Sequence, residues 1–205
     1  MFAVIFEVQP KRDRWDQYLE LAKLLRPELE RIDGFIDNER FRSRRTEGRL
    51  LSLSIWADEK AVIRWRTHAM HHGVQEKGRF EVFQDYHLRV GEITADTHLP
   101  PQRELAQQRF DVTEVGPAKM ISICEGDAIP EPPSAGVHDS ELYESITTEG
   151  KLLRLISWHD ITAAEAWQPA SVRHRQVRVI RDYGMTDRRE APQFYPEVAR
   201  SLTGG

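Results

Sequence analysis

Several features of common protein classes are scarce or missing in this sequence, and each gap removes a class of function. Cys124 is the only cysteine, so no disulfide within the chain and no paired-cysteine zinc motif can form. No run approaches the roughly 20 apolar residues that cross a membrane. Residues 1–7 lack the basic start of a secretion signal, and we expect a cytoplasmic protein with no membrane partner.

Charge and catalytic signatures exclude further classes. The net charge is −4, with 30% charged residues, which gives no electrostatic basis for binding nucleic acid. The chain has no Gly-rich phosphate loop and no serine-elbow motif, so nucleotide-binding and hydrolase functions have no support. Cys124 lies in an apolar stretch, where a buried inert thiol is the expected role. We also expect no metal site, because no histidine group has a carboxylate close by in sequence.

What the chain does contain is an internal repeat. Residues 46–56 recur as residues 148–158, a shift of 148 − 46 = 102 positions, and Trp65 matches Trp167 at the same shift. A chain of 205 residues is long enough for two domains of about 100 residues each. We therefore predict an internal duplication.

The repeat divides the chain into three segments. We expect a first unit at residues 1–95, a linker at 96–116 that contains a proline pair, and a degenerate second unit with a C-terminal tail at 117–205. A Pro-rich loop at 126–136 leaves no room for a long first helix in the second unit.

Hydrophobic spacing predicts the elements of both units. The first unit has the order strand, helix, strand, strand, helix, strand, which is ferredoxin-like (βαββαβ) and gives an α+β fold. A cap at Asp13 opens its first helix, and a capping box at Thr162–Glu165 opens the remaining helix of the second unit. The expected first-unit elements are strand 2–9, helix 14–32, strands 35–44 and 50–56, helix 58–79 and strand 82–90. The expected second-unit strands are 119–125, 142–147, 152–158 and 179–183.

The segment from Trp65 to Arg79 reads W-R-x-H-x-x-H-x-x-x-Q-x-x-G-R. This pattern resembles the antibiotic biosynthesis monooxygenase (ABM) family, whose members also include bacterial haem-degrading oxygenases. The resemblance is good over residues 1–95 and weak over 117–185. It implies a dimeric α/β-barrel, in which units of about 100 residues pair their sheets. We expect the two ferredoxin-like units of this chain to form that barrel as a pseudo-dimer, with a homodimer of the whole chain as a further option.

The resemblance also implies site residues in the first unit. A tryptophan at the position of Trp65 lines the substrate cavity in the resembling oxygenases, although the match to Trp167 equally fits a core anchor. His71 and His72 are the expected bases, because imidazole titrates near neutral pH; surface histidines are the alternative. On a continuous helix His68 shares a face with His72. The expected catalytic residues are thus His71, His72 and Trp65, and the expected substrate-binding residues are His68, Gln75, Arg79 and Tyr86.

Three functions follow from the resemblance. The first is a monooxygenase that oxidises an aromatic or phenolic small molecule with O2 and without a dedicated cofactor. The second is a haem-binding or haem-degrading oxygenase, but that branch has an asparagine on the first strand and a histidine ten residues after the tryptophan. Here the first strand has no asparagine and Gln75 stands at the histidine position, so His71 or His72 would have to bind the iron. The third is a non-catalytic barrel that binds a small ligand.

Overall fold

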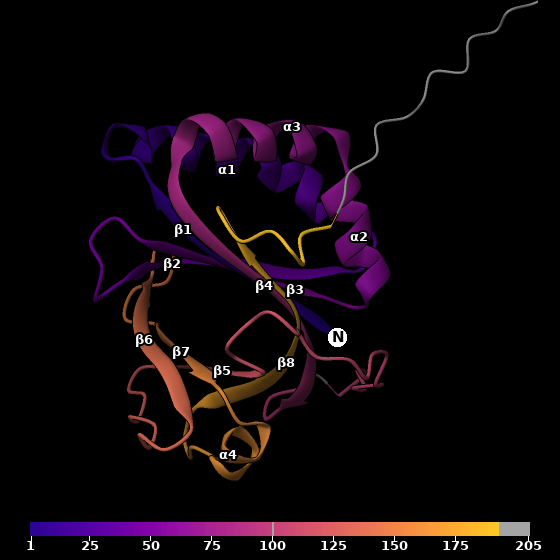
Figure 1. The fold of residues 1–205 in the computed structure, drawn as a ribbon, viewed down its shortest axis with the longest axis vertical. Coiled ribbons are helices and arrows are strands. Elements are labelled where there is room, and N and C mark those ends of the chain that lie inside the picture. The colour runs from indigo at the N-terminus through magenta and orange to yellow at the C-terminus, as the bar shows by residue number, and fades with distance from the viewer. Residues whose placement is uncertain (100, 193–205) are drawn as a thin grey trace, which may run out of the picture.

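The computed structural model describes residues 1–99 and 101–192, with the exception of the side chain of His72. Within these residues, eight antiparallel strands close into one barrel in the order β1-β3-β2-β6-β7-β5-β8-β4 (Figure 1). A 3₁₀ turn at Arg12–Arg14 precedes α1, and a π-helical turn at Gly78–Val82 follows α3. The elements are β1 (Phe2–Pro10), α1 (Trp15–Glu30), β2 (Phe35–Ser43), β3 (Leu50–Trp56), α2 (Glu59–Thr67), α3 (Ala69–Lys77), β4 (Phe83–Asp96), β5 (Met120–Gly126), β6 (Val137–Ser145), β7 (Leu152–Trp158), α4 (Ile161–Ala166) and β8 (Arg173–Gly184).

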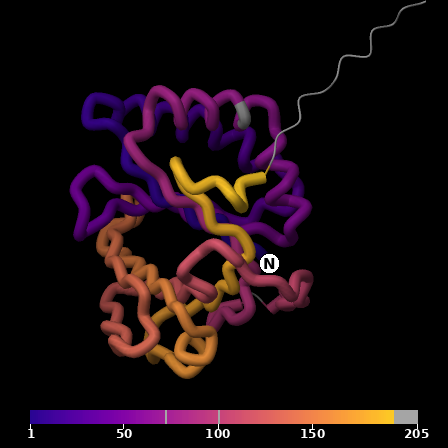
Figure 2. Tube along the Cα trace, in the orientation of Figure 1, coloured from indigo at the N-terminus to yellow at the C-terminus, as the bar shows by residue number. Residues whose placement is uncertain are grey.

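The barrel interior is an apolar core to which both halves of the chain contribute. Alternate residues of each strand point inward, as Ala3 and Ile5 do on β1 and Ile121 and Ile123 do on β5. The outer faces are covered by helices: α2 contacts β1 and β3, whereas α4 contacts β5 and β7. The Cα trace shows α1, α2 and α3 gathered on one side of the barrel (Figure 2). Burial on both faces explains why β1, β3, β5 and β7 are apolar at most positions.

The two halves use equivalent strand registers. Phe2 pairs with Trp56 across β1 and β3, and Met120 pairs with Trp158 across β5 and β7. Each indole nitrogen donates to a nearby serine hydroxyl, at 2.9 Å in Trp56 and 3.1 Å in Trp158. The halves are joined where β2 pairs with β6 and where β4 pairs with β8. One chain therefore supplies both sheets of the barrel.

A close helix approach depends on glycine in both halves. Gly34 has a φ of 88°, and a Cβ added there would lie 2.7 Å from the Cβ of Ala61 in α2. Gly136 has a φ of 78°, and its Cβ would lie 2.6 Å from that of Ala163 in α4. Only glycine adopts these left-handed conformations without strain while leaving that space.

Two expectations for the first half are corrected. The helix expected over 58–79 is interrupted at His68, whose extended backbone (φ −62°, ψ 126°) ends α2 and precedes α3. Asp13 does not cap α1, because it lies inside the 3₁₀ turn and α1 has no side-chain cap. The cap at Asp58 does form, since its side chain accepts from the Ala61 amide at 2.8 Å.

The second half also differs from expectation in its boundaries. β6 begins at Val137 rather than at 142, and β8 begins at Arg173 rather than at 179. Asp160, not Thr162, caps α4 by accepting from the Thr162 amide at 2.8 Å. Residues 127–136 form no helix, as the proline content of this loop predicted. Charged residues in the extended parts of β6 and β8 hid these strands, because their side chains pair with residues from elsewhere in the barrel, as Asp139 does with Arg45 and Arg173 with Asp96.

Candidate functional site

Trp65 lies at the centre of a stack of rings on the outer face of the first half. It is half-buried on α2, with the ring of Trp56 at 6.5 Å, that of His68 at 5.9 Å and that of His71 at 4.1 Å between centroids. The His71 ring lies nearly parallel to the indole, at 16°. The structure therefore brings together three of the seven residues expected at the site.

The break in the helix decides how the histidines lie. His68 stands at the junction of α2 and α3, with Nε2 3.7 Å from the carboxylate of Glu28. His71 Nδ1 lies 2.9 Å from the Trp65 carbonyl oxygen. Because a carbonyl only accepts, Nδ1 carries a proton in this contact and Nε2 is the basic nitrogen of the neutral ring. His71 is thus held in the tautomer that a general base needs.

The remaining expected residues lie elsewhere or outside the described part. Gln75 is half-buried on α3, and the Arg79 guanidinium lies 5.2 Å from the Phe80 ring centroid. Tyr86 is buried in a different apolar cluster, with Val8 and Tyr18. The side chain of His72 lies outside the described residues. The continuous helix that was expected to carry His68 and His72 on one face is interrupted at His68.

The ring stack does not fit a haem bound against Trp65. The indole face that a porphyrin would cover is in contact with the His71 ring at 4.1 Å. Gln75, at the position of the branch's usual iron ligand, supplies an amide in place of an imidazole. His71 Nδ1 is engaged by the Trp65 carbonyl. No step of a mechanism is therefore assigned to haem.

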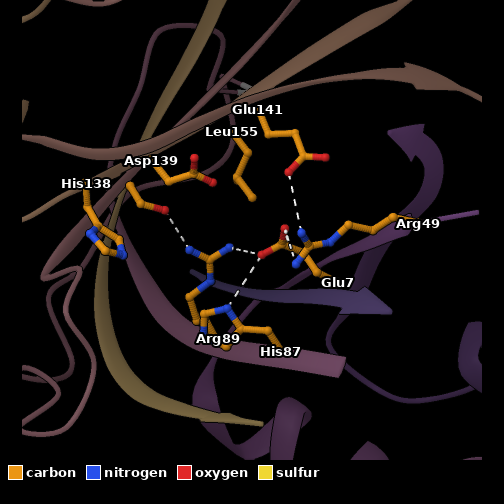
Figure 3. Close-up of a pocket in the computed structure, with 9 residues that line it drawn as sticks. Glu7, Arg49, His87, Arg89, His138, Asp139, Glu141 and Leu155 are labelled. Carbon is orange, nitrogen blue, oxygen red and sulfur yellow. Dashed lines mark hydrogen bonds and ion pairs between the residues drawn. The ribbon is translucent and has the colours of Figure 1, made fainter. Parts of the chain in front are cut away.

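A second group of polar residues, which the sequence did not reveal as a site, lies inside the barrel (Figure 3). Glu7 on β1 is 5% exposed and binds Arg89 of β4, which is 3% exposed. The Tyr143 hydroxyl donates to Glu7 at 2.6 Å, and Arg89 donates to the Ser157 hydroxyl at 2.7 Å. We call Glu7, Arg49, Arg89 and Glu141 the open cluster.

The charges of the open cluster stabilise one another. Burial alone would raise the pKa of Glu7, but Arg89, the Tyr143 hydroxyl and Arg49 together hold that pKa below its ordinary value. Burial next to Glu7 raises the pKa of the Tyr143 phenol, so this hydroxyl stays a donor. Glu7 is therefore ionised at neutral pH, with a protonated phenol beside it.

Equivalent strand positions in the other half hold a second charged group. Glu7 and Glu125 pair with Leu51 and Leu153 in their respective sheets. Arg89 and Arg175 pair in the same way with Ile5 and Ile123. Glu39 corresponds to Glu141, and Lys151 to Arg49. We call Glu125, Lys151, Arg175 and Glu39 the closed cluster, because Lys151 binds both Glu39 and Glu125, the latter at 2.7 Å.

Two cavities adjoin the open cluster. An inner cavity of about 80 Å³ is lined by its four residues together with His87, His138, Asp139, Leu155 and Ser157. An outer cavity of about 330 Å³ lies between β4, the end of β8 and residues 115–117. Arg49 and His87 line both cavities. No member of the closed cluster lines either one.

Other chemistry has less support in the structure. Across residues 1–99 and 101–192, no three His, Cys, Asp or Glu side chains gather in a way that could hold a metal ion. Burial raises the pKa of the Cys124 thiol to about 12, which disfavours a reactive thiolate. No helix in the described part of the chain is long and apolar enough to cross a membrane.

Comparison with known proteins adds the decisive observation. A model of the family described as antibiotic biosynthesis monooxygenase matches residues 1–77. Jasmonate monooxygenase ABM from Pyricularia oryzae is 43% identical to this chain over 218 aligned positions, which cover 97% of the chain and 100% of that protein. The chain belongs to the antibiotic biosynthesis monooxygenase family. The resemblance read from Trp65–Arg79 is thereby confirmed.

One further sequence relative and one solved structure resemble different parts of this chain. The uncharacterized protein YqjZ of Bacillus subtilis is 30% identical over 92 residues, which cover 45% of this chain and 78% of that protein. A solved structure of aldoxime dehydratase in complex with butyraldoxime has a TM-score of 0.55 at 11% identity and covers 87% of this chain and 79% of its own. That second likeness shows a shared fold and nothing about activity.

Proposed function

We propose that this protein is a monooxygenase whose substrate is a small carboxylic acid of the jasmonate type, a cyclopentanone with an acid side chain. The observation that carries the proposal is the 43% identity to Jasmonate monooxygenase ABM over 97% of the chain. The alignment covers 97% of the chain and therefore both of its halves, whereas a shared fold alone would leave the chemistry open.

We place the chemistry on the Trp65 side of the first half. Trp65 would form a flat apolar wall for the substrate, and His71, with Nε2 as its basic nitrogen, would take a proton from a carbon next to the ring ketone, the acidic C–H of such a substrate. The carbanion would add O2, and two electrons from an external reductant would convert the resulting hydroperoxide into the alcohol and water. Gln75, His68 and Arg79 are the proposed polar contacts around them. His72 remains part of the proposal from its sequence position.

A phenolic substrate oxidised without a cofactor is the second candidate. The specific observation in its favour is the parallel stack of His71 on Trp65, at 4.1 Å and 16°, because a flat phenol can lie against the edge of such a stack within reach of the imidazole. His71 would deprotonate the phenol, and the resulting anion would react with O2.

Electron balance separates the two candidates. Hydroxylation of a saturated carbon puts one oxygen atom into the substrate and reduces the other to water, so two electrons must come from an external reductant. Oxidation of a phenol's ring CH2 tautomer to a quinone draws all electrons from the substrate and needs no reductant. A requirement for a reductant therefore identifies the substrate class.

The test is oxygen uptake by the purified protein, with jasmonate or a panel of polycyclic phenols, with and without reduced nicotinamide. Uptake with jasmonate that matches the amount of hydroxylated product, measured by mass spectrometry, supports the proposal. Uptake only with phenols and without reductant favours the second candidate. No uptake with either substrate would overturn both and leave a non-catalytic ligand-binding barrel. Titration with haem provides a further check, since a saturable absorption band would contradict the poor fit of the ring stack.

We also infer that the chain is an internal duplication that forms a pseudo-dimer, with residues 1–95 and 117–205 as its units. The equivalent registers at Trp56 and Trp158 support this inference. A homodimer of the whole chain and a cytoplasmic location belong to the same proposal. Solution mass tests the homodimer, and cross-links between strands β3 and β7 within one chain test the pseudo-dimer.

A further inference from the structure

The outer cavity has the size and the lining of a small-molecule site. Its volume of about 330 Å³ lies within the range of roughly 300–1,000 Å³ that small-ligand pockets occupy. Apolar groups form much of one wall, namely Tyr86, Val115, Pro117, Tyr183 and Met185. Arg49 and His87 stand where this cavity meets the inner one.

Arg49 is the charged group of this region whose donors are least used. Its guanidinium lies 3.6 Å from Glu7 and 3.7 Å from Glu141, and it donates no hydrogen bond to any residue that the structure describes. Its counterpart Lys151 binds two carboxylates directly. Arg49 is also 28% exposed, so a ligand in the outer cavity can reach it.

The carboxylates nearest Arg49 already accept from other side chains. Glu7 is paired with Arg89, and Glu141 with Arg45 at 2.5 Å. Asp182 accepts from His87 Nε2 at 2.6 Å. Two further carboxylates, Asp85 and Asp187, line the outer cavity; Asp85 is exposed and Asp187 is paired with Arg189.

The inner cavity, which adjoins the outer one, lies at two positions where residues are smaller than their equivalents. Ser157 pairs with Asp139, whereas its counterpart Ile55 pairs with Asp37. His87 pairs with Glu7, whereas Arg173, the larger counterpart, pairs with Glu125. The open cluster thus has both more room and one cation without a hydrogen-bonded partner.

We propose that the outer cavity binds a small organic carboxylate, with the carboxylate group on Arg49 and the apolar body against Tyr86 and Tyr183. The planar guanidinium can donate two parallel hydrogen bonds to such a group. This inference rests on the proposed function for the choice of probe, because jasmonate is a carboxylate with an apolar body. Tyr86, expected from the sequence to bind substrate, acquires that role here, apart from the Trp65 stack.

The test is isothermal titration of the full-length protein with jasmonate and with its neutral methyl ester. We expect saturable binding of the acid, and Arg49→Gln should weaken it roughly 10- to 100-fold, since hydrogen bonds to charged groups are lost. Arg49→Gln should leave the affinity for the methyl ester unchanged. Arg49→Lys should restore part of the affinity, because it keeps the charge without the planar fork.

Lys151→Gln is the matched control, since it removes the equivalent cation from the closed cluster and should leave acid binding unchanged. Circular dichroism melts of both variants check that they fold. Equal affinity of wild type and Arg49→Gln for the acid would overturn the proposal, as would an absence of saturable binding of jasmonate. Turnover is measured separately. Arg49-dependent binding of jasmonate without turnover supports the carboxylate site and rejects the proposed function. Turnover of jasmonate, with the same affinity in Arg49→Gln as in wild type, supports the proposed function and rejects the carboxylate site.

Discussion

The two halves of this chain build the same strands and place different chemistry on them. In the second half, Lys151 bridges Glu39 and Glu125, and Arg175 binds Glu125, so the closed cluster satisfies its own charges. In the first half, the open cluster has Arg49 too far from its carboxylates for hydrogen bonds. A few substitutions at equivalent positions, rather than a different fold, therefore create the cavity.

The outer faces show a similar contrast. Trp167 packs against Trp158 at 5.8 Å and His174 at 5.5 Å, much as Trp65 packs against Trp56 and His71. His174 is 2% exposed, and burial lowers the pKa of its imidazole, so it is a neutral core residue. The tryptophan anchors the helix in both halves, and only the first half adds an accessible histidine beside it.

The largest expected effect concerns this contrast between the histidines. His71→Ala should lower kcat about 100- to 10,000-fold, the usual contribution of a general base. It should also remove the acid limb of the pH profile of kcat, which a purely structural role would not do. His174→Ala, the matched change in the second half, should leave kcat of the folded protein unchanged. Retained turnover in His71→Ala would exclude His71 as the base.

The next effect concerns the buried ion pairs. Arg89→Met should destabilise the protein by about 3–5 kcal/mol, because it leaves Glu7 charged and without its main partner. Urea denaturation measures this change. Adding Glu7→Gln in the same chain should recover part of the loss, since the unpaired charge is then absent. A double variant no more stable than Arg89→Met would show that the arginine acts mainly through packing.

A smaller effect on stability should follow when the inner cavity beside the open cluster is filled. Ser157→Ile introduces into the inner cavity the residue found at the equivalent position, Ile55. The crowding should lower the free energy of unfolding by about 1–3 kcal/mol. We expect this variant to weaken jasmonate binding as well, because the junction between the two cavities, at Arg49 and His87, becomes narrower. Calorimetric unfolding and the binding titration report the two effects separately. Unchanged affinity for jasmonate would place the ligand away from this junction.

The smallest effect concerns the hydroxyl that distinguishes Tyr143 from its counterpart Phe41. Tyr143→Phe should cost about 1.5 kcal/mol at neutral pH, the lower end for a hydrogen bond to a charged group. The folded-state pKa of Glu7 lies below the ordinary 4.5, so its ionised form contributes stability above that pH and loses it as pH falls through the lowered value. The variant raises this folded pKa toward the ordinary value, so the acid-induced fall of its melting temperature should start at the same pH as in wild type, but be smaller and end at a higher pH. Melting temperatures between pH 7 and pH 3 test this.

Local patterns predicted most of the fold. The alternation and the turns gave β1, β2, β3, β5 and β7 within a few residues, and the apolar spacing after Asp58 placed the start of α2. The interruption at His68 was not predictable, because neither glycine nor proline marks it. β6 and the first part of β8 were hidden by charged residues that pair only across the closed barrel.

The site divides along the same line. The sequence by itself determined the family, through Trp65–Arg79, and the antiparallel α+β elements, since both depend on residues close together in the chain. Only the tertiary structure decided that Glu7, Arg49, Arg89 and Glu141 meet inside the barrel. These residues come from three strands, β1, β4 and β6, and from the position just before β3, and Glu7 and Glu141 stand 134 positions apart (141 − 7). Closing the barrel removes these side chains from water. Burial makes an unpaired charge costly in free energy, so their ion pairs and the incompletely bonded Arg49 depend on the tertiary structure.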